Sequence, residues 1–389
     1  MQKELNPKLC INIENSQKNY DLKDGSEISF GKVKCRFNIA KTEKGFSYSV
    51  VLNNYSDECF SPDSLSITSG IDTYMISYPQ WNDCFFPSFF RCERTHFYGY
   101  FMSPESKIIG VYSESPIACY SLNYNGGGHR IEDVNFSLIH SGNMPWHHSQ
   151  NLNCIEPNSS LEWKFNFCFC DTLDEFTDIL ASRGLPVIKS KNLVSVLGQS
   201  FDIQVECRDN FEVEIISPDG KKITDNRPDN YGCHSITVKS DKGKISTGFA
   251  YCRKPWEWYF KVARKQAILK PPKATNNCES WYGFYTMFLG AKHYPELKFD
   301  TPAEEMFCEI MPYMFDMDAA EPIIITERLQ NVSTFIGVLV DRYQANPERQ
   351  RESLVLASRF ADWLITRQGS DGAYYRDGIH YTCVIYPAK

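Results

Sequence analysis

The sequence predicts a multi-domain α+β protein with an N-terminal antiparallel β-sandwich (residues 1–185), a small immunoglobulin-like β domain (186–254) and C-terminal α-helical hairpins (255–389). Up to about residue 254, short runs of β-branched and aromatic residues alternate with turn residues, as is typical of strands. From Pro255 onward, apolar residues recur at helical spacing. The length of 389 residues is sufficient for two or three domains.

In the first domain, predicted strands lie between turn dipeptides, and one short helix is expected at 174–184, with Phe176 and Ile179 on one face. The second β domain begins after Leu185 and contains a Pro-Asp-Gly turn at 218–220. Examples of predicted strands are 47–52, 65–68, 98–102, 108–112 and 161–169 in the first domain and 201–207, 211–216, 232–238 and 248–252 in the second.

Five helices and the start of a sixth are expected after Pro255. The third has the clearest start, because Thr301 can cap it, Pro302 fits the first helical position and Glu304 completes a Thr-x-x-Glu capping box. Antiparallel hairpins of such helices build a bundle or an α/α toroid. The helices are expected from 255, at 279–291, at 301–315, at 329–343, from 346–347, and after 381.

Charge and composition narrow the class of ligand. The formal net charge is −7 and there is no long Lys/Arg run, so nucleic acid is not expected as a partner. The 14% aromatic content, with 26 Phe and 22 Tyr, indicates stacking surfaces and favours a neutral or sugar-like ligand.

No apolar run approaches the roughly 20 residues of a membrane helix, so membrane insertion is not expected. Without a signal-like N-terminus, the chain is predicted to be cytoplasmic, or periplasmic or secreted if a signal has been removed.

The 15 cysteines form no Cys-x-x-Cys pair and their number is odd. Cys168 and Cys170 alternate along a predicted strand, so neither a zinc site nor a disulfide framework is indicated. We therefore expect buried free thiols, no metal and no cofactor.

Chemically active residues gather in the segments that precede the second, fourth and sixth helices. If the helices alternate between an outer and an inner ring, these segments lie at one end of the barrel. Glycan cleavage needs an acid, a base and aromatic faces that hold the sugar. The predicted catalytic residues are Glu279, Asp371, Asp377, His380 and Tyr381. The predicted substrate-binding residues in these segments are Trp281, Tyr282, Glu327, Arg328, Tyr374, Tyr375 and Arg376.

Several of these residues also have a structural explanation, whereas His380 and Tyr381 beside Tyr374, Tyr375 and Arg376 are harder to explain in this way. Glu279 can stabilise a helix N-terminus, and Glu327 with Arg328 can form a surface pair. Asp371 and Gly372 form a favourable turn dipeptide, and Trp281 with Tyr282 can belong to a helix core. Their joint placement favours the functional explanation.

The first domain adds polar and aromatic loops at 85–91, 126–130 and 145–148. A loop that supplies Trp146 or His147 to the toroid rim is one hypothesis, since such loops often bind ligands. The triple glycine at 126–128 lacks the P-loop pattern, and adjacent histidines such as His147 and His148 diverge too much for a metal pair.

The architecture, with the segments Glu-Ser-Trp-Tyr-Gly at 279–283, Gln-Gly-Ser-Asp-Gly-Ala-Tyr at 368–374 and the end from His380 to Lys389, resembles the six-hairpin glycosidase-like proteins of polysaccharide-degrading bacteria. The resemblance implies hydrolysis of plant or host glycans in the mouth of an (α/α)6 toroid, or β-elimination as in related lyases. A complete toroid has about twelve helices, so this one is incomplete. Either the chain is truncated, or a second copy in a homo-oligomer covers the open helical layer.

We therefore expect a glycoside hydrolase that cleaves an oligo- or polysaccharide with carboxylate acid/base chemistry. One alternative is a polysaccharide lyase, in which Tyr381 or His380 is the base and Arg376 neutralises a uronate carboxylate. The other is a non-catalytic glycan-binding or assembly module. The sugar, the linkage and the stereochemical outcome do not follow from the sequence, because carboxylate separation decides between retention and inversion.

Overall fold

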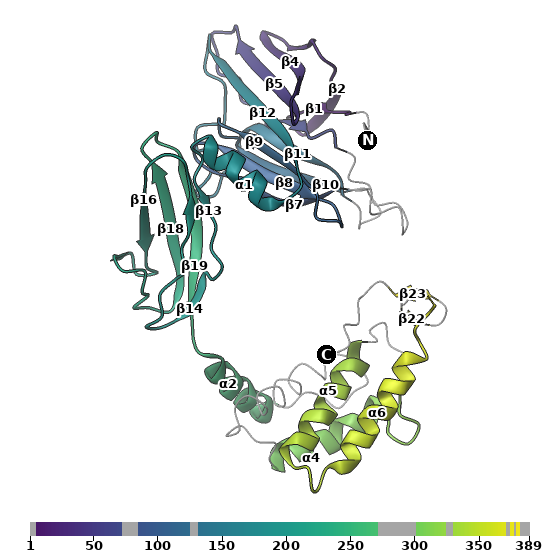
Figure 1. Ribbon diagram of the computed structural model, residues 1–389. Helices are drawn as coiled ribbons and strands as arrows, with labels where there is room; N and C mark the ends of the chain where they lie inside the picture. Colours follow the sequence, from purple (N-terminus) through teal and green to yellow (C-terminus); the bar gives the residue numbers. More distant parts are fainter. Residues whose placement is uncertain are drawn as a thin grey trace. The chain divides into compact units, whose positions relative to one another are not determined.

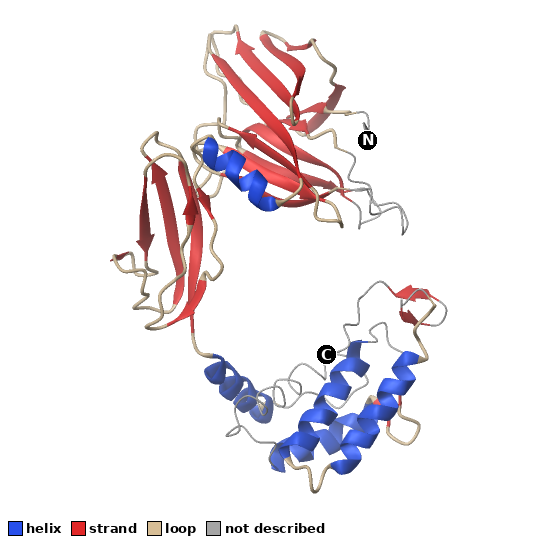
Figure 2. Cartoon of the chain, viewed as in Figure 1, coloured by secondary structure: helices blue, strands red, loops and turns tan. Residues whose placement is uncertain are grey.

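The computed structural model describes residues 5–71, 85–124, 131–270, 301–323, 330–370, 374–376 and 379–381. The chain divides into two compact units, Met1–Arg253 and Lys254–Lys389 (Figure 1). The first unit consists almost entirely of strands and the second mainly of helices (Figure 2). The expectation of a multi-domain α+β protein with mostly antiparallel sheets is confirmed.

The first part of unit one is a sandwich of two antiparallel sheets. The five-stranded sheet has the order β10 (Cys119–Tyr124), β11 (Ile131–His140), β6 (Ser64–Thr68), β1 (Lys8–Ile13) and β2 (Ser16–Asp21). The seven-stranded sheet has the order β3 (Ser26–Phe30), β4 (Val33–Thr42), β5 (Gly45–Asn54), β12 (Ser160–Cys170), β9 (Ile108–Ser113), β8 (Phe97–Met102) and β7 (Phe86–Cys92). The strands predicted from the sequence in this domain lie within β5, β6, β8, β9 and β12.

A single aromatic core fills the space between the two sheets. Phe136 of β11 stacks on Phe165 of β12 with ring centroids 5.3 Å apart, and both side chains are fully buried. Burial of one such side chain contributes about 1.5–3 kcal/mol to stability. In β7, the register shifts between Pro87 and Phe89, so this last strand of the sheet is irregular.

Helix α1 (Leu173–Ser182) covers part of the seven-stranded sheet. Thr172 caps the helix, because its hydroxyl accepts a hydrogen bond from the amide of Glu175 at 3.1 Å. Phe176 packs directly over Gly110 of β9, where a Cβ atom would lie 2.1 Å from the ring. The predicted helix at 174–184 is confirmed to within two residues at each end.

The second part of unit one contains a two-stranded and a five-stranded sheet. The strands of the first are β13 (Val187–Ile188) and β15 (Val205–Glu206). The order of the second is β14 (Val194–Val196), β19 (Ile245–Arg253), β18 (Gly232–Ser240), β16 (Phe211–Ile216) and β17 (Lys222–Ile223). Only β14 and β19 pair in parallel among these strands. The predicted Pro-Asp-Gly turn joins β16 to β17, and its Gly220 has a φ of 82°.

Unit two is helical. Its core is aromatic, with Phe335 of α5 stacked on Phe315 at 4.2 Å and edge-on to Phe360 of α6 at 5.0 Å between ring centroids. Its described elements are α2 (Trp256–Leu269), α4 (Thr301–Ile310), a 3₁₀ turn (Met311–Tyr313), β20 (Phe315–Asp316), β21 (Glu321–Pro322), α5 (Gln330–Ala345), α6 (Arg351–Ile365), β22 (Tyr374–Arg376) and β23 (Ile379–Tyr381).

Two helix boundaries in unit two differ from the prediction. The third predicted helix ends at Ile310 and tightens into the 3₁₀ turn, which contains Pro312. The fifth begins at Arg351, because the backbone and side chain of Asn346 accept hydrogen bonds from Gln350 and Arg349 in a preceding turn. The predicted helices at 279–291 and after 381 lie outside the described residues.

The described cysteines are free thiols, as expected, but not all are buried. Cys59, Cys233 and Cys308 are exposed, so the expectation of burial is wrong for these three. No helix in the described ranges has the length and apolar content needed to cross a membrane.

Candidate functional site

The predicted carboxylates and several predicted binding residues lie outside the part of the chain that the structure describes. These residues are Glu279, Trp281, Tyr282, Glu327, Arg328, Asp371 and Asp377. Their roles stay predictions.

The remaining predicted residues of unit two form the hairpin of β22 and β23. In its antiparallel register, Tyr374 lies opposite Tyr381, Tyr375 opposite His380 and Arg376 opposite Ile379. Successive strand positions alternate between the two faces, and opposed positions share a face. Tyr374, Arg376 and Tyr381 therefore occupy positions on one face of the hairpin, and Tyr375 and His380 occupy positions on the other.

The loop with Trp146 and His147 belongs to unit one, where it meets the second β part. Arg94 donates from Nε to the carbonyl oxygen of Trp146 at 2.8 Å, and its guanidinium lies 5.5 Å from the centre of the indole ring. Phe249 of β19 contacts the same indole edge-on, with centroids 6.3 Å apart. Trp146, at 44% exposure, thus combines a packing role with an accessible aromatic surface.

Phe249 and Tyr251 extend this aromatic surface along β19. They are two residues apart on one face of the strand and are 42% and 45% exposed. Exposed rings of this kind can stack on the apolar face of a sugar.

His147 beside Trp146 is poorly suited to acid/base work. Burial, helped by His148 and Arg91, lowers the pKa of His147 to about 4. Its Nδ1 is buried and has no hydrogen-bond partner among the described residues. A histidine with this pKa stays neutral near pH 7 and is a weak proton acceptor.

The buried centre of the same junction is an ion pair. Glu93 is fully buried, and Arg91 donates to its Oε1 from Nε at 3.1 Å and from Nη2 at 2.9 Å. Thr247 of β19 donates to the carboxylate through its amide at 3.1 Å and its hydroxyl at 2.7 Å. Arg91 also donates to the carbonyl of Thr247 at 2.6 Å. These contacts join the sandwich to the second β part.

A polar groove of about 210 Å³ crosses the face of the five-stranded sheet that points away from the core. A row of small polar residues forms its floor, because Cys119 pairs with Ser137, Ser137 with Ser66 and Ser66 with Cys10 in the strand register. The lining residues are Cys10, Ile11, Asn12, Gln17, Ser64, Ser66, Cys119, Ser121, Asn123, Asn135, Ser137 and His140.

The amides at one side of the groove hold each other in place. Asn135 donates to Oδ1 of Asn123 at 2.6 Å, and Asn123 donates back at 3.3 Å. Gly142 donates to Nδ1 of His140 at 2.9 Å, so the neutral imidazole carries its proton on Nε2. The buried Oδ1 of Asn12 has no partner in the described ranges and is left as an acceptor.

The groove is lined by uncharged, mostly polar side chains together with one histidine, His140. None of the lining residues is Asp, Glu, Lys or Arg. Burial raises the pKa of Cys10 to about 11 and also raises that of Cys119, so both thiols stay protonated. Uncharged donors and acceptors on a strand surface complement the hydroxyl groups of a neutral sugar.

Comparisons with known proteins give a match in structure but none in sequence. No protein-family model and no curated protein matches the sequence. A solved structure of a polysaccharide lyase matches with a TM-score of 0.69 and 10% sequence identity. The match covers 94% of this chain and 62% of the lyase, so this chain spans less than two thirds of that protein. At this identity the likeness concerns the fold alone. The fold of this chain is similar to that of a large part of this polysaccharide lyase.

Proposed function

We propose that the chain is a carbohydrate-active protein of the polysaccharide lyase kind, which acts on a uronate-containing glycan. The observation that carries the proposal is the likeness to a polysaccharide lyase over 94% of the chain. We also propose that the second β part of unit one is immunoglobulin-like and that the helices of unit two belong to an α/α toroid. Hydrolysis by Glu279, Asp371 and Asp377 becomes the second candidate, because the structural neighbour is a lyase and fits the lyase alternative at least as well as the hydrolase one.

β-Elimination needs two groups close to one uronate. A base removes the proton from the carbon next to the carboxylate, and the electron pair forms a double bond to the neighbouring carbon. The bond from that carbon to the glycosidic oxygen breaks, and the oxygen leaves and takes a proton from the protonated base or from water. A cation beside the carboxylate stabilises the negative charge that develops. The hairpin register supports Tyr381 as the base and Arg376 as the cation, since both occupy positions on one face. His380 occupies a position on the opposite face.

The test is a screen of the full chain against neutral and uronate-containing glycans, with unsaturated uronate followed by absorbance and new reducing ends followed chemically. We expect Tyr381→Phe to lower the rate of unsaturated uronate formation by about 10²- to 10⁴-fold, the usual contribution of a positioned acid or base. Arg376→Ala should have a comparable effect. Glu279→Gln is the control and should retain activity.

Other results would contradict the lyase proposal. New reducing ends without the absorbance, lost in Glu279→Gln, Asp371→Asn or Asp377→Asn, would establish a hydrolase. Absence of both products with every glycan would reject catalysis by this chain.

The polar groove favours one further candidate function, the binding of a neutral glycan by unit one. We expect neutral oligosaccharides to bind the full chain in calorimetry. Asn135→Ala removes amide contacts, and because one hydrogen bond contributes about 0.5–1.5 kcal/mol, it should weaken binding by about 10-fold. Asn166→Ala on the other sheet is the matched control. Equal affinity of the two variants would reject the groove as the site.

A further inference from the structure

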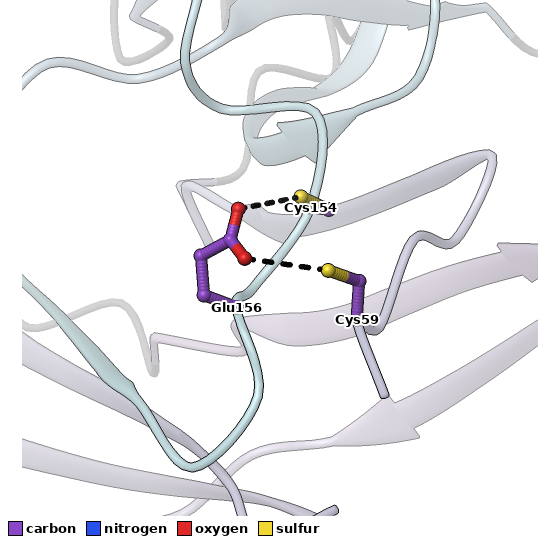
Figure 3. Close-up of side chains that lie close together, drawn as sticks. All are labelled: Cys59, Cys154 and Glu156. Atoms are coloured by element: carbon purple, nitrogen blue, oxygen red, sulfur yellow. Dashed lines mark hydrogen bonds between the residues drawn. The ribbon is translucent and has the colours of Figure 1, made fainter. Parts of the chain in front are cut away.

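Three metal-ligating side chains meet on the surface of the sandwich, outside the sites described above. They are Cys59, Cys154 and Glu156, and their ligating atoms all lie within 4.8 Å of one another. Figure 3 shows both thiols directed at the same carboxylate. Cys59 Sγ lies 3.4 Å from Oε2 of Glu156, and Cys154 Sγ lies 3.7 Å from Oε1.

The strand register explains why these residues meet. Phe60 and Ile155 form an isolated antiparallel bridge, with their amides donating to each other's carbonyls at 3.0 and 2.9 Å. Cys59 precedes Phe60 and Glu156 follows Ile155, so the two lie opposite each other across the bridge. Cys154 is two residues from Glu156 and shares its face. Ile155 itself is fully buried, so its neighbours face outward.

Buried Asn54 holds the two segments in position. Its Nδ2 donates to the carbonyls of Glu58, Ile155 and Glu156 at 2.8–3.1 Å. Ser61 adds a hydrogen bond from its hydroxyl to the carbonyl of Asn153 at 2.9 Å. The backbone on both sides of the cluster is therefore fixed before any ligand binds, which lowers the entropic cost of binding.

We propose that Cys59, Cys154 and Glu156 form a zinc-binding site that clips the 54–61 segment to the 153–156 segment, independently of the proposed function. Thiolate sulfur and carboxylate oxygen are common zinc ligands, and thiolates select zinc over magnesium or calcium. With Zn–S near 2.3 Å and Zn–O near 2.1 Å, tetrahedral ligands lie about 3.6 Å apart for a sulfur–oxygen pair. Each thiol is close to this distance from one oxygen of the carboxylate, Cys59 Sγ at 3.4 Å from Oε2 and Cys154 Sγ at 3.7 Å from Oε1. Three protein ligands leave the fourth position to water.

The test is a titration of the reduced full chain with Zn²⁺ in competition with a chromophoric chelator, and with Co²⁺ followed by its thiolate charge-transfer absorption. We expect Cys59→Ser and Cys154→Ser each to weaken zinc binding more than about 100-fold, beyond the usual effect of outer-shell changes. Glu156→Gln should weaken it without loss of the cobalt–thiolate band. Cys233→Ser, at another exposed free cysteine, is the matched control and should leave binding unchanged.

Zinc should also raise the melting temperature of the wild-type chain but not that of Cys59→Ser. Equal zinc affinity in wild type and in Cys59→Ser would overturn the proposal. So would a disulfide between Cys59 and Cys154 that resists treatment with a reductant, because it would leave no thiolate for the metal. Circular dichroism of each variant without metal separates loss of binding from loss of fold.

Discussion

At the scale of single residues, His96 shows how burial changes the chemistry of a side chain. It is fully buried at the junction of the two β parts and stacks on Tyr98. Its ring nitrogens face the hydroxyls of Thr95 and Ser246 at 3.1 and 3.4 Å. Burial, with the nearby charges of Lys244 and Arg91, lowers the pKa of His96 to about 3 from its usual 6.5.

This pKa predicts a loss of stability in acid. Below pH 6.5 the unfolded chain binds a proton at His96, whereas the folded chain does so only near pH 3. The contribution of neutral His96 to the free energy of unfolding is therefore complete above pH 6.5. Between pH 6.5 and about 3 the free energy of unfolding falls by up to about 1.4 kcal/mol per pH unit. Urea unfolding at several pH values should show a smaller acid dependence in His96→Gln than in the wild type. Parallel pH profiles would contradict the prediction.

The residues of the zinc proposal show why some sites escape sequence analysis. Cys59 and Glu156 are 97 positions apart, and only the bridge between Phe60 and Ile155 brings them together. The sequence lacks the short spacing that marks common zinc motifs. For the same reason it predicts no metal at this place.

At the scale of elements, the contact of α1 with β9 depends on one missing side chain. Phe176 lies directly over Gly110, where a Cβ atom would come within 2.1 Å of its ring. Phe176 is almost fully buried, so its ring can move only by disturbing the residues around it.

Gly110→Ala is therefore expected to lower the free energy of unfolding of unit one by about 1–3 kcal/mol through overpacking. Gly337→Ala is the matched control, because nothing lies within 4 Å of a Cβ atom at that position of α5. That change should be neutral or stabilise its helix by about 0.5–1 kcal/mol. Both values can be measured by urea unfolding, and equal effects would contradict the explanation.

Element positions were largely predictable where residue periodicity is strong. The predicted strand at 161–169 lies within β12, whose burial alternates, and α1 has both a cap and an apolar face. Predicted boundaries were less accurate where a turn competes with the first turn of a helix. At Asn346 a hydrogen-bonded turn forms first, so α6 begins only at Arg351. The polar groove was missed, although Ser64, Ser66 and Thr68 alternate with apolar residues in β6.

At the scale of the whole molecule, the two β parts of unit one are joined by buried polar contacts. Glu93 is central, because it accepts hydrogen bonds from Arg91 and from Thr247 across the junction. Removal of the carboxylate is costly, since it leaves the largely buried guanidinium of Arg91 without its charged partner.

Glu93→Ala should lower the stability of unit one by about 3 kcal/mol, because Arg91 is 21% exposed and keeps little hydration. Glu27→Ala, which breaks an exposed pair with Lys34, is the control and should change stability by less than about 0.5 kcal/mol. Denaturant unfolding followed by fluorescence gives both values. Similar losses in the two variants would mean that the junction contributes no more than a surface pair.

The functional hypothesis was predictable only in outline. Aromatic content, low positive charge and the segments near residues 279 and 371–381 led to a carbohydrate-active protein with helical hairpins. The ranking of hydrolase over lyase depended on assumed positions of carboxylates, which sequence spacing cannot supply. The hairpin register adds a placement that the sequence lacked, because the positions of Tyr381 and Arg376 share one face of the hairpin and that of His380 is on the other.

The irregular strand β7 has a consequence for the behaviour of the protein at high concentration. It ends the seven-stranded sheet among the described strands, and Pro87 has no amide hydrogen to offer to a further strand. The register shift beside Pro87 twists the strand away from a flat template. A neighbouring molecule therefore finds no continuous row of donors and acceptors along β7, which makes this edge a poor template for the addition of a strand.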